Sequence, residues 1–222
     1  MRTLFQQKTA SLAGAMAALL LFAASASANT IVFNNALQGG SQNDYVLGMD
    51  FDVNTAVTVT QLGTFDDFGN GFDSLTTIQV GIFTTAGALI GPSATFTTAT
   101  PGTLVGGSRF LSIAPFVLLP GNYSIVATGY TPLSQSGNSQ SELLPVFNNL
   151  GGALTLVPNG GRWNEQGNDP FVLPTDNIGG YGQPDPVFLA GTFAAAVPDG
   201  GTASMMLGFG LLAAGWLRRF IK

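Results

Sequence analysis

The chain has 222 residues, of which 9% are charged and 45% hydrophobic, and it contains neither cysteine nor histidine. Disulfides, thiolate nucleophiles, histidine-based catalytic triads and metal sites built on cysteine or histidine are therefore excluded. The span 29–196 holds two basic and eleven acidic residues, a net charge of −9. That charge argues against nucleic acid or an anionic membrane surface as a partner, and it permits divalent cations.

Residues 1–28 are predicted to be a signal peptide. Arg2 and Lys8 provide its positive start and a short apolar stretch follows. Small residues then favour cleavage by signal peptidase after Ala26 or Ala28. The apolar stretch is too short for an uncleaved membrane helix. We therefore expect the protein to be exported.

Residues 29–195 are predicted to form one all-β domain. Over residues 45–53, apolar side chains alternate with small or acidic ones, which is typical of a strand with one buried face. The candidate strands cover residues 30–33, 45–53, 57–65, 78–82, 88–96, 108–119, 123–127 and 187–194. Short strands joined by Gly, Pro and Asn turns predict a two-sheet antiparallel sandwich with jelly-roll-like topology. An N-terminal signal helix and a C-terminal transmembrane helix are expected to flank it.

The carboxylates of the predicted strand 45–53 and of residues 131–186 show no spacing typical of a catalytic site. Asp50 and Asp52 share one face of a strand, where they either join a metal site or form a solvated face. An enzyme without histidine or cysteine would need a carboxylate pair. No spacing selects a pair among Glu142, Glu165 and Asp169. The chain is therefore predicted not to be an enzyme, and no catalytic residue is predicted.

The segment from Asp66 to Asp73 is the most chemically suggestive part of the domain. Its candidate metal ligands are Asp66, Asp67, Asn70 and Asp73, and its glycines would let a loop fold around a cation. Calcium prefers roughly six to eight oxygen ligands, so calcium is the candidate cofactor, although the spacing matches no named calcium motif. The alternative is a hairpin loop in which Asn70 and Gly71 form the turn and the acids are solvated.

Residues 131–186 are rich in Gly, Ser and Pro and are interpreted as long loops and short strands. Within them, Trp163 is the candidate carbohydrate-binding residue, because an indole can stack on a flat sugar face beside polar neighbours. Tyr130, Tyr181 and Phe72 could provide further stacking surfaces. The alternative is that Trp163 closes over the hydrophobic core.

The C-terminus holds a second predicted targeting signal, in which a polar motif, an uncharged stretch at residues 202–217 and a basic cluster follow one another. As a helix, this stretch would be about 24 Å long, slightly short of a ~30 Å hydrocarbon core. Trp216 would lie at the membrane interface, and Arg218 and Arg219 would stay cytoplasmic, so that the domain lies outside. The motif residues are Val197, Pro198, Asp199, Gly200 and Gly201.

This tail, residues 197–222, resembles the PEP-CTERM class of bacterial sorting signals in its Val-Pro-Asp-Ser-Gly variant, with Gly200 in place of the serine. The resemblance implies an exosortase-type transpeptidase that cuts near the motif and passes the protein from the inner membrane to the cell envelope surface or extracellular matrix. Segments 47–51, 59–66 and 80–83 are similar to the DUF4082 group of β-sandwich ectodomains, which implies a fold and no assigned activity.

Together these features predict an exported, non-catalytic surface or extracellular-matrix protein, structural or adhesive within the exopolysaccharide of a biofilm. Its membrane contact would be a transient anchor through the C-terminal helix. The alternative is a carbohydrate-binding module that contacts extracellular polysaccharide and holds a structural calcium. No nucleic-acid partner is expected.

Overall fold

The computed structural model of this chain describes residues 29–34, 45–138, 146–165, 171–177 and 188–198. They belong to one unit of the chain, Ala28–Pro198. Within the described ranges the chain forms β-strands and two 3₁₀ turns, η2 (Asp67–Gly69) and η3 (Leu150–Gly152), without an α-helix. Every strand pair is antiparallel. The prediction of an all-β antiparallel fold is confirmed, and both predicted flanking helices lie outside the described residues.

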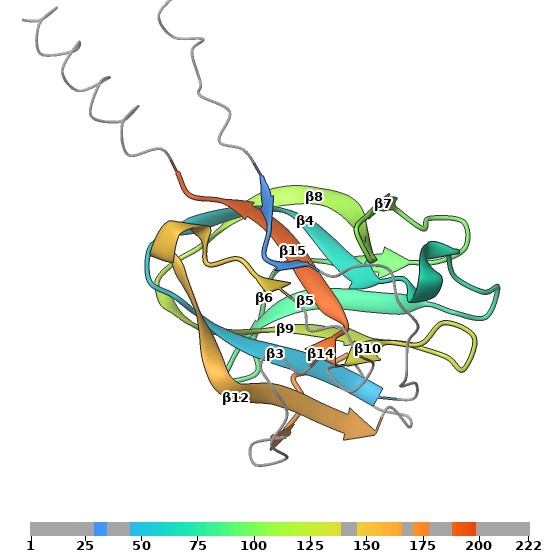
Figure 1. Cartoon of the computed structure of the whole chain (residues 1–222). Coiled ribbons are helices and arrows are strands. Elements are labelled where there is room, and N and C mark those ends of the chain that lie inside the picture. Colours follow the sequence, from blue (N-terminus) through green and yellow to red (C-terminus); the bar gives the residue numbers. More distant parts are fainter. Residues whose placement is uncertain (1–28, 35–44, 139–145, 166–170, 178–187, 199–222) are drawn as a thin grey trace, which may run out of the picture. The chain divides into compact units, whose positions relative to one another are not determined.

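Two larger sheets contain most of the strands (Figure 1). The five-stranded sheet has the order β1 (Thr30–Ile31), β15 (Gly191–Ala196), β4 (Val57–Phe65), β8 (Ser108–Leu118) and β7 (Thr103–Val105). The six-stranded sheet has the order β13 (Asp176–Asn177), β12 (Leu154–Glu165), β3 (Tyr45–Val53), β9 (Gly121–Thr128), β5 (Ile78–Thr84) and β6 (Leu89–Phe96). Two short pairs are β10 (Gly137–Asn138) with β14 (Phe188–Leu189), and β11 (Val146–Phe147) with β2 (Phe33–Asn34).

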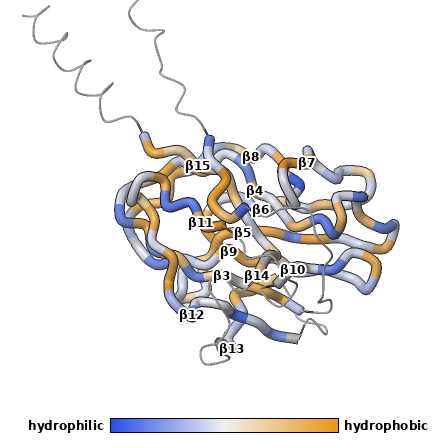
Figure 2. Tube along the Cα trace, in the orientation of Figure 1, coloured by the Kyte–Doolittle hydropathy of each residue, from blue (hydrophilic) through white to orange (hydrophobic). Residues whose placement is uncertain are grey.

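β3 and β4 have the bounds that were predicted from the sequence. In β3, the alternation of apolar with small or acidic residues determines which side chains face the core. Leu47, Met49 and Phe51 of β3 are buried in the main hydrophobic cluster, and the residues between them face the other side of the sheet. Figure 2 shows hydrophobic and hydrophilic segments following one another along the described strands. β3 and β4 then lie in different sheets, so the connection between them crosses from one layer to the other.

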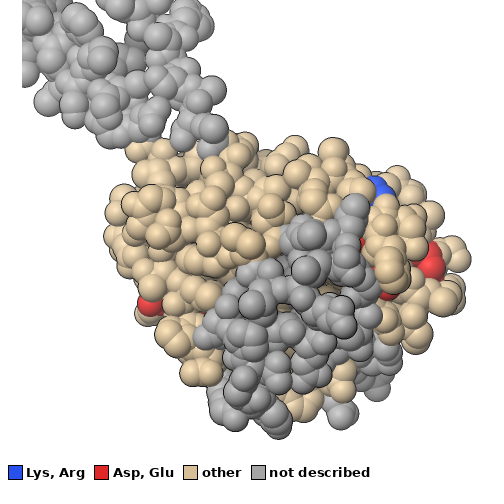
Figure 3. Space-filling model, viewed as in Figure 1, with Lys and Arg blue, Asp and Glu red and all other residues tan. Residues whose placement is uncertain are grey.

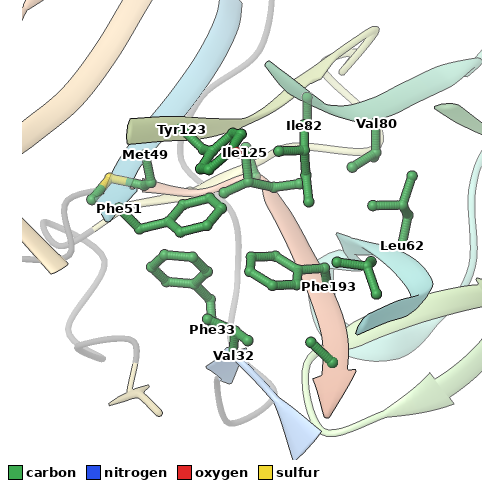
Figure 4. Packing of buried hydrophobic residues seen from close by; sticks show 14 of the residues in the cluster. Val32, Phe33, Met49, Phe51, Leu62, Val80, Ile82, Tyr123, Ile125 and Phe193 are labelled. Atoms are coloured by element: carbon green, nitrogen blue, oxygen red, sulfur yellow. The ribbon is translucent and has the colours of Figure 1, made fainter. Parts of the chain in front are cut away.

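The main hydrophobic cluster lies between the two sheets and draws side chains from both (Figure 4). Phe51 comes from the six-stranded sheet and Phe193 from the five-stranded sheet, and their ring centroids are 5.1 Å apart. Phe33 packs edge-on against both rings. Fully burying such a side chain stabilises the fold by roughly 1.5–3 kcal/mol, so these contacts hold the layers together.

A tyrosine holds the connection between β8 and β9, which lie in different sheets and do not pair with each other. Tyr123, the third residue of β9, donates a hydrogen bond of 2.9 Å from its hydroxyl to the carbonyl oxygen of Leu119. A tyrosine bonded to the backbone a few residues upstream is the tyrosine-corner arrangement of Greek-key sandwiches. The bond fixes the chain between Leu119 and Tyr123, where it passes from one sheet to the other.

The interpretation of residues 131–186 as loops and short strands is wrong for β12. This strand has 12 residues and pairs with β3 along most of its length. Its register shifts between Leu156 and Gly161, where residues 157–160 bulge out of the ladder. Pro158 lies in this bulge, because proline cannot donate to a central ladder. The bulge interrupts the alternation that would identify the strand.

Candidate functional site

The segment from Asp66 to Asp73 connects β4 to β5 and therefore passes from the five-stranded sheet to the six-stranded one. β4 and β5 do not pair with each other, so the alternative of a hairpin loop is wrong. The segment contains η2 and, with the connections 97–102 and 129–136, forms one end of the domain, on the right in Figure 1. Its acids meet two different sets of partners.

Asp66 forms an ion pair with Arg109 of β8 and is fully buried. Its two carboxylate oxygens also accept the backbone N–H of Gly71, each at 3.1 Å. The guanidinium of Arg109 donates in addition to the carbonyl oxygens of Gly69 and Gly102, both at 3.3 Å. The arginine thus ties the loop after β4 to the connection before β7.

Asp73 lies at the centre of a hydroxyl network. Its carboxylate accepts hydrogen bonds from the hydroxyls of Thr76, Thr131 and Ser134, and from the backbone N–H of Leu75 at 2.8 Å. The bonds from Thr131 and Ser134 measure 2.7 and 3.1 Å. Hydrogen bonds from Thr76 first, then from Thr131 and the Leu75 backbone, lower the pKa of Asp73 from 3.8 to about 2. The carboxylate is charged at neutral pH.

Two tight turns lie side by side around this carboxylate. In one, the N–H of Thr76 donates to the carbonyl of Asp73 at 3.1 Å. In the other, Thr131 and Ser134 exchange two backbone bonds of 3.1 Å. Each turn has a leucine in its third position, Leu75 and Leu133, with 83% and 74% of its surface exposed. Asp73 therefore joins two turns that each display an apolar side chain.

Gly129 explains how the second turn approaches the first. Its φ of 99° lies in the region that favours glycine, and an added Cβ would lie 1.9 Å from the carbonyl oxygen of Thr77. Any larger residue would push the 129–136 connection away from the backbone before β5. The close approach is what brings Thr131 and Ser134 within reach of Asp73.

Phe68 adds a third exposed apolar side chain at this end of the domain. Its ring is 68% exposed, and its backbone has φ 59° and ψ 2° in the left-handed region. A bulky residue rarely adopts this conformation, which costs of order 1–3 kcal/mol. The bonds of Asp66 and Arg109 to Gly69 and Gly71 on either side hold the backbone in this shape.

The four candidate metal ligands are thus not gathered around one point. Asp66 is paired with Arg109, Asp73 is bonded to hydroxyls, Asp67 is half-buried and Asn70 is exposed. Among the described residues, no group of three or more acidic side chains is placed to hold a metal ion. Calcium at this segment stays a prediction, and a cation there would have to compete with the guanidinium.

The acids of β3 differ from the solvated face that the alternation suggests. Asp50 is buried and forms an ion pair with Arg162 of β12, whose Nε lies 2.7 and 2.9 Å from its two oxygens. Gly48 lies beside this ion pair and leaves space for it: an added Cβ would lie 2.8 Å from Ser124 Oγ and 3.5 Å from the Cβ of Arg162. Asp52 accepts a hydrogen bond from Asn122 at 2.6 Å. These partners of Asp50 and Asp52 thus come from β12 and β9, and none of them belongs to the 66–73 segment.

Trp163 lies within strand β12, opposite Leu47 of β3, and not in a loop. It is half-buried against the main hydrophobic cluster and meets Tyr45 edge-on, with ring centroids 5.6 Å apart. Of the other aromatic candidates, Phe72 and Tyr130 are buried, and burial raises the pKa of the Tyr130 hydroxyl. Tyr181 lies outside the described residues.

The predicted sorting motif begins where the last strand ends. β15 ends at Ala196, Val197 packs half-buried against the main cluster, and Pro198 is exposed. The remaining predicted residues lie outside the described part of the chain: Asp199, Gly200, Gly201, Trp216, Arg218 and Arg219. The described ranges contain no helix with the length and apolarity that a bilayer crossing requires.

Arg109, Thr131 and Ser134 were not among the residues predicted for this site. Arg109 is one of only two basic residues in the span 29–196, and this scarcity was the available signal that it has an acidic partner. The serine and threonine of the 131–134 turn carry no such signal in the sequence, because their partner Asp73 is about sixty residues away.

Comparison with known proteins adds no relative: no family model matches the chain, and no curated protein matches it.

Proposed function

We propose that this chain is an exported, non-catalytic surface or extracellular-matrix protein, built as a jelly-roll-like β-sandwich and sorted by an exosortase-type transpeptidase. The observation that carries the proposal is the position of the polar motif directly behind the last strand. Val197 still packs against the core, whereas Pro198 is exposed, so a processing enzyme could reach the chain from Pro198 onward. A signal at this point can be removed without opening the domain.

The chemistry of the described side chains supports a scaffold. Asp50 and Asp66 are bound to the two arginines of the span 29–196, and Asp73 is bound to hydroxyls that keep it ionised. Charged side chains are sparse on the face shown in Figure 3. A surface of hydroxyls, amides and apolar groups suits packing among neutral polymers. The side chains that an enzyme would need lie outside the described part of the structure: Glu142, Glu165 and Asp169.

Removal of the tail tests the sorting part of the proposal in the producing cell. A chain ending at Pro198 should be released into the medium, whereas the full chain should fractionate with the envelope or matrix. A chain with Arg218 and Arg219 both changed to Gly is the matched control, since it retains the motif and the apolar stretch but loses the basic end. Identical fractionation of the full and truncated chains would contradict the proposal.

Carbohydrate binding is the second candidate function, and the half-exposed pair of Trp163 and Tyr45 favours it. Affinity electrophoresis in gels that contain neutral polysaccharide tests it. If the indole stacks on sugar, Trp163→Ala should abolish retardation and Trp163→Phe should preserve part of it. Equal migration of all three proteins, with and without polysaccharide, would remove this candidate.

A further inference from the structure

The hydroxyl of Ser124 is buried in the six-stranded sheet without a hydrogen-bond partner. Ser124 belongs to β9 and has no exposed surface. Within the part of the chain that the structure describes, its Oγ is the one buried side-chain oxygen or nitrogen that makes no hydrogen bond. A buried hydroxyl has given up its bonds to bulk water, so folded proteins nearly always supply a replacement. The Ser124 hydroxyl therefore points to a group that is bound beside it.

The register of the sheet determines what lies on each side of this hydroxyl. Ser124 is opposite Asp50 of β3 and opposite Phe83 of β5. Residues directly opposite each other on antiparallel strands project from the same face, with Cβ atoms about 4.5–5.5 Å apart. Phe83 belongs to a small hydrophobic cluster and meets Phe171 edge-on, with ring centroids 5.2 Å apart. The β5 side is therefore apolar, and a polar partner must come from the side of Asp50.

Gly48 keeps side-chain atoms away from the polar side of the hydroxyl. An added Cβ at Gly48 would lie 2.8 Å from Ser124 Oγ, and 3.5 Å from side-chain carbons of Arg162 and Val126. Gly48 is not among the glycines with a positive φ, so its contribution here is space and not backbone conformation. Arg162 is opposite Gly48 on β12 and reaches from there to Asp50. A small group above Gly48 would thus lie between the Ser124 hydroxyl and the ion pair.

The Asp50–Arg162 pair has hydrogen-bonding capacity left for such a group. Both carboxylate oxygens of Asp50 accept from Arg162 Nε, and a carboxylate oxygen can accept more than one bond. A water molecule can donate to this carboxylate and also bond to the Ser124 hydroxyl, which gives it the two polar partners that a buried water needs. A metal cation suits the place less well, because the guanidinium already neutralises the carboxylate and would repel a second positive charge.

We propose that Ser124, Asp50 and Arg162 form the binding site of one buried water molecule above Gly48. The water donates a hydrogen bond to the Asp50 carboxylate and pairs with the Ser124 hydroxyl. It thereby extends the ion pair between β12 and β3 to β9, so that one polar network joins three neighbouring strands of the six-stranded sheet. The site belongs to the domain itself and does not depend on the proposed sorting or on sugar binding.

The substitution Ser124→Ala in the full-length chain tests the site through the sign of its effect on stability. If a water pairs with the hydroxyl, the variant loses that bond and should unfold at a lower urea concentration than the wild type. If the hydroxyl is unpaired, the variant loses an unsatisfied polar group and should unfold at a higher concentration. Ser112→Ala is the matched control, because Ser112 is exposed on β8, and its midpoint should not change. A raised or unchanged midpoint for Ser124→Ala overturns the proposal.

A Gly48→Ala background provides a second test, because its methyl group would displace the water. In that background, Ser124→Ala has no water to lose and removes the oxygen that the new Cβ would contact at 2.8 Å. Ser124→Ala should therefore raise the urea midpoint there, although it lowers the midpoint of the wild type. Such a change of sign shows that the two positions share one bound group. The same sign in both backgrounds overturns the water site.

A high-resolution crystal structure of the full-length chain identifies the bound group. Density for a single oxygen atom should lie within hydrogen-bond distance of Ser124 Oγ and of an Asp50 carboxylate oxygen. A direct bond from the hydroxyl to a protein atom, without such density, overturns the proposal. Exchanging sodium chloride for choline chloride separates water from a sodium ion. The melting temperature should not change, and a lower value in choline chloride would assign the site to the cation instead.

Discussion

Arg162 donates from its Nε to both carboxylate oxygens of Asp50, at 2.7 and 2.9 Å, across the outer face of the six-stranded sheet. The side chains retain 19% and 7% of their surface exposure. Removing one partner of such a pair leaves a buried charge without compensation. This pair and the Asp66–Arg109 pair account for both basic side chains of the span 29–196.

The first prediction concerns the stability of this pair. Asp50→Ala should lower the free energy of unfolding by about 3 kcal/mol, because Arg162 would remain as an unpaired, largely buried cation. The double variant Asp50→Leu/Arg162→Met should recover most of that loss, since it removes both charges. Urea denaturation measures the difference. If Asp50→Ala unfolds at the same urea concentration as the wild type, the ion pair does not stabilise the fold.

Strand positions were largely predictable from the sequence, because alternation is a local property. β3 and β4 could be read directly from residues 45–53 and 57–65. β12 could not, since the bulge with Pro158 interrupts the alternation and the long pairing with β3 appears only after folding.

The candidate site was predictable in position and not in chemistry. The acids at 66–73 do form an organised loop, but the groups that neutralise and bind them come from far along the chain. Arg109 lies 43 residues after Asp66, and Ser134 lies 61 residues after Asp73. The spacing of the acids within residues 66–73 therefore suggested a bound cation. In the structure these acids instead meet the guanidinium of Arg109 and the hydroxyls around Asp73.

Acid stability should depend on Asp73. Its folded pKa of about 2 lies below the ordinary 3.8, so the stabilisation is complete above about pH 4 and is lost as the pH falls toward 2. The difference in melting temperature between wild type and Asp73→Asn should shrink over this range. Thr131→Val removes one of the hydrogen bonds to the carboxylate, so it should raise the pKa of Asp73 and narrow the pH range over which the stabilisation is lost. A difference that stays constant down to pH 2 would exclude Asp73 as the titrating group.

Arg109 provides a test of the calcium prediction. If the 66–73 segment binds calcium, the cation competes with the guanidinium for Asp66. Arg109→Gln should therefore show a larger rise in melting temperature with calcium than the wild type, and the chelator EDTA should reverse it. Asp67→Asn combined with Arg109→Gln is the control and should lose the response. No shift in any of the proteins would remove the calcium site.

The tyrosine corner should contribute measurably to stability. Tyr123→Phe removes the hydroxyl that bonds to the Leu119 carbonyl and should lower the free energy of unfolding by about 1 kcal/mol. Leu119→Ala is the matched control, because the acceptor is a backbone carbonyl and the bond should survive. Urea denaturation that ranks Leu119→Ala as the more damaging change would indicate that side-chain packing dominates at this turn.

Mass spectrometry of the mature C-terminus tests the central claim most directly. Protein isolated from the envelope or matrix of the producing cell should begin near residue 27 or 29 and end within the motif Val197, Pro198, Asp199, Gly200 and Gly201, without the apolar stretch and the basic end. Recovery of the mature protein with an intact C-terminal Lys222 would contradict sorting by cleavage.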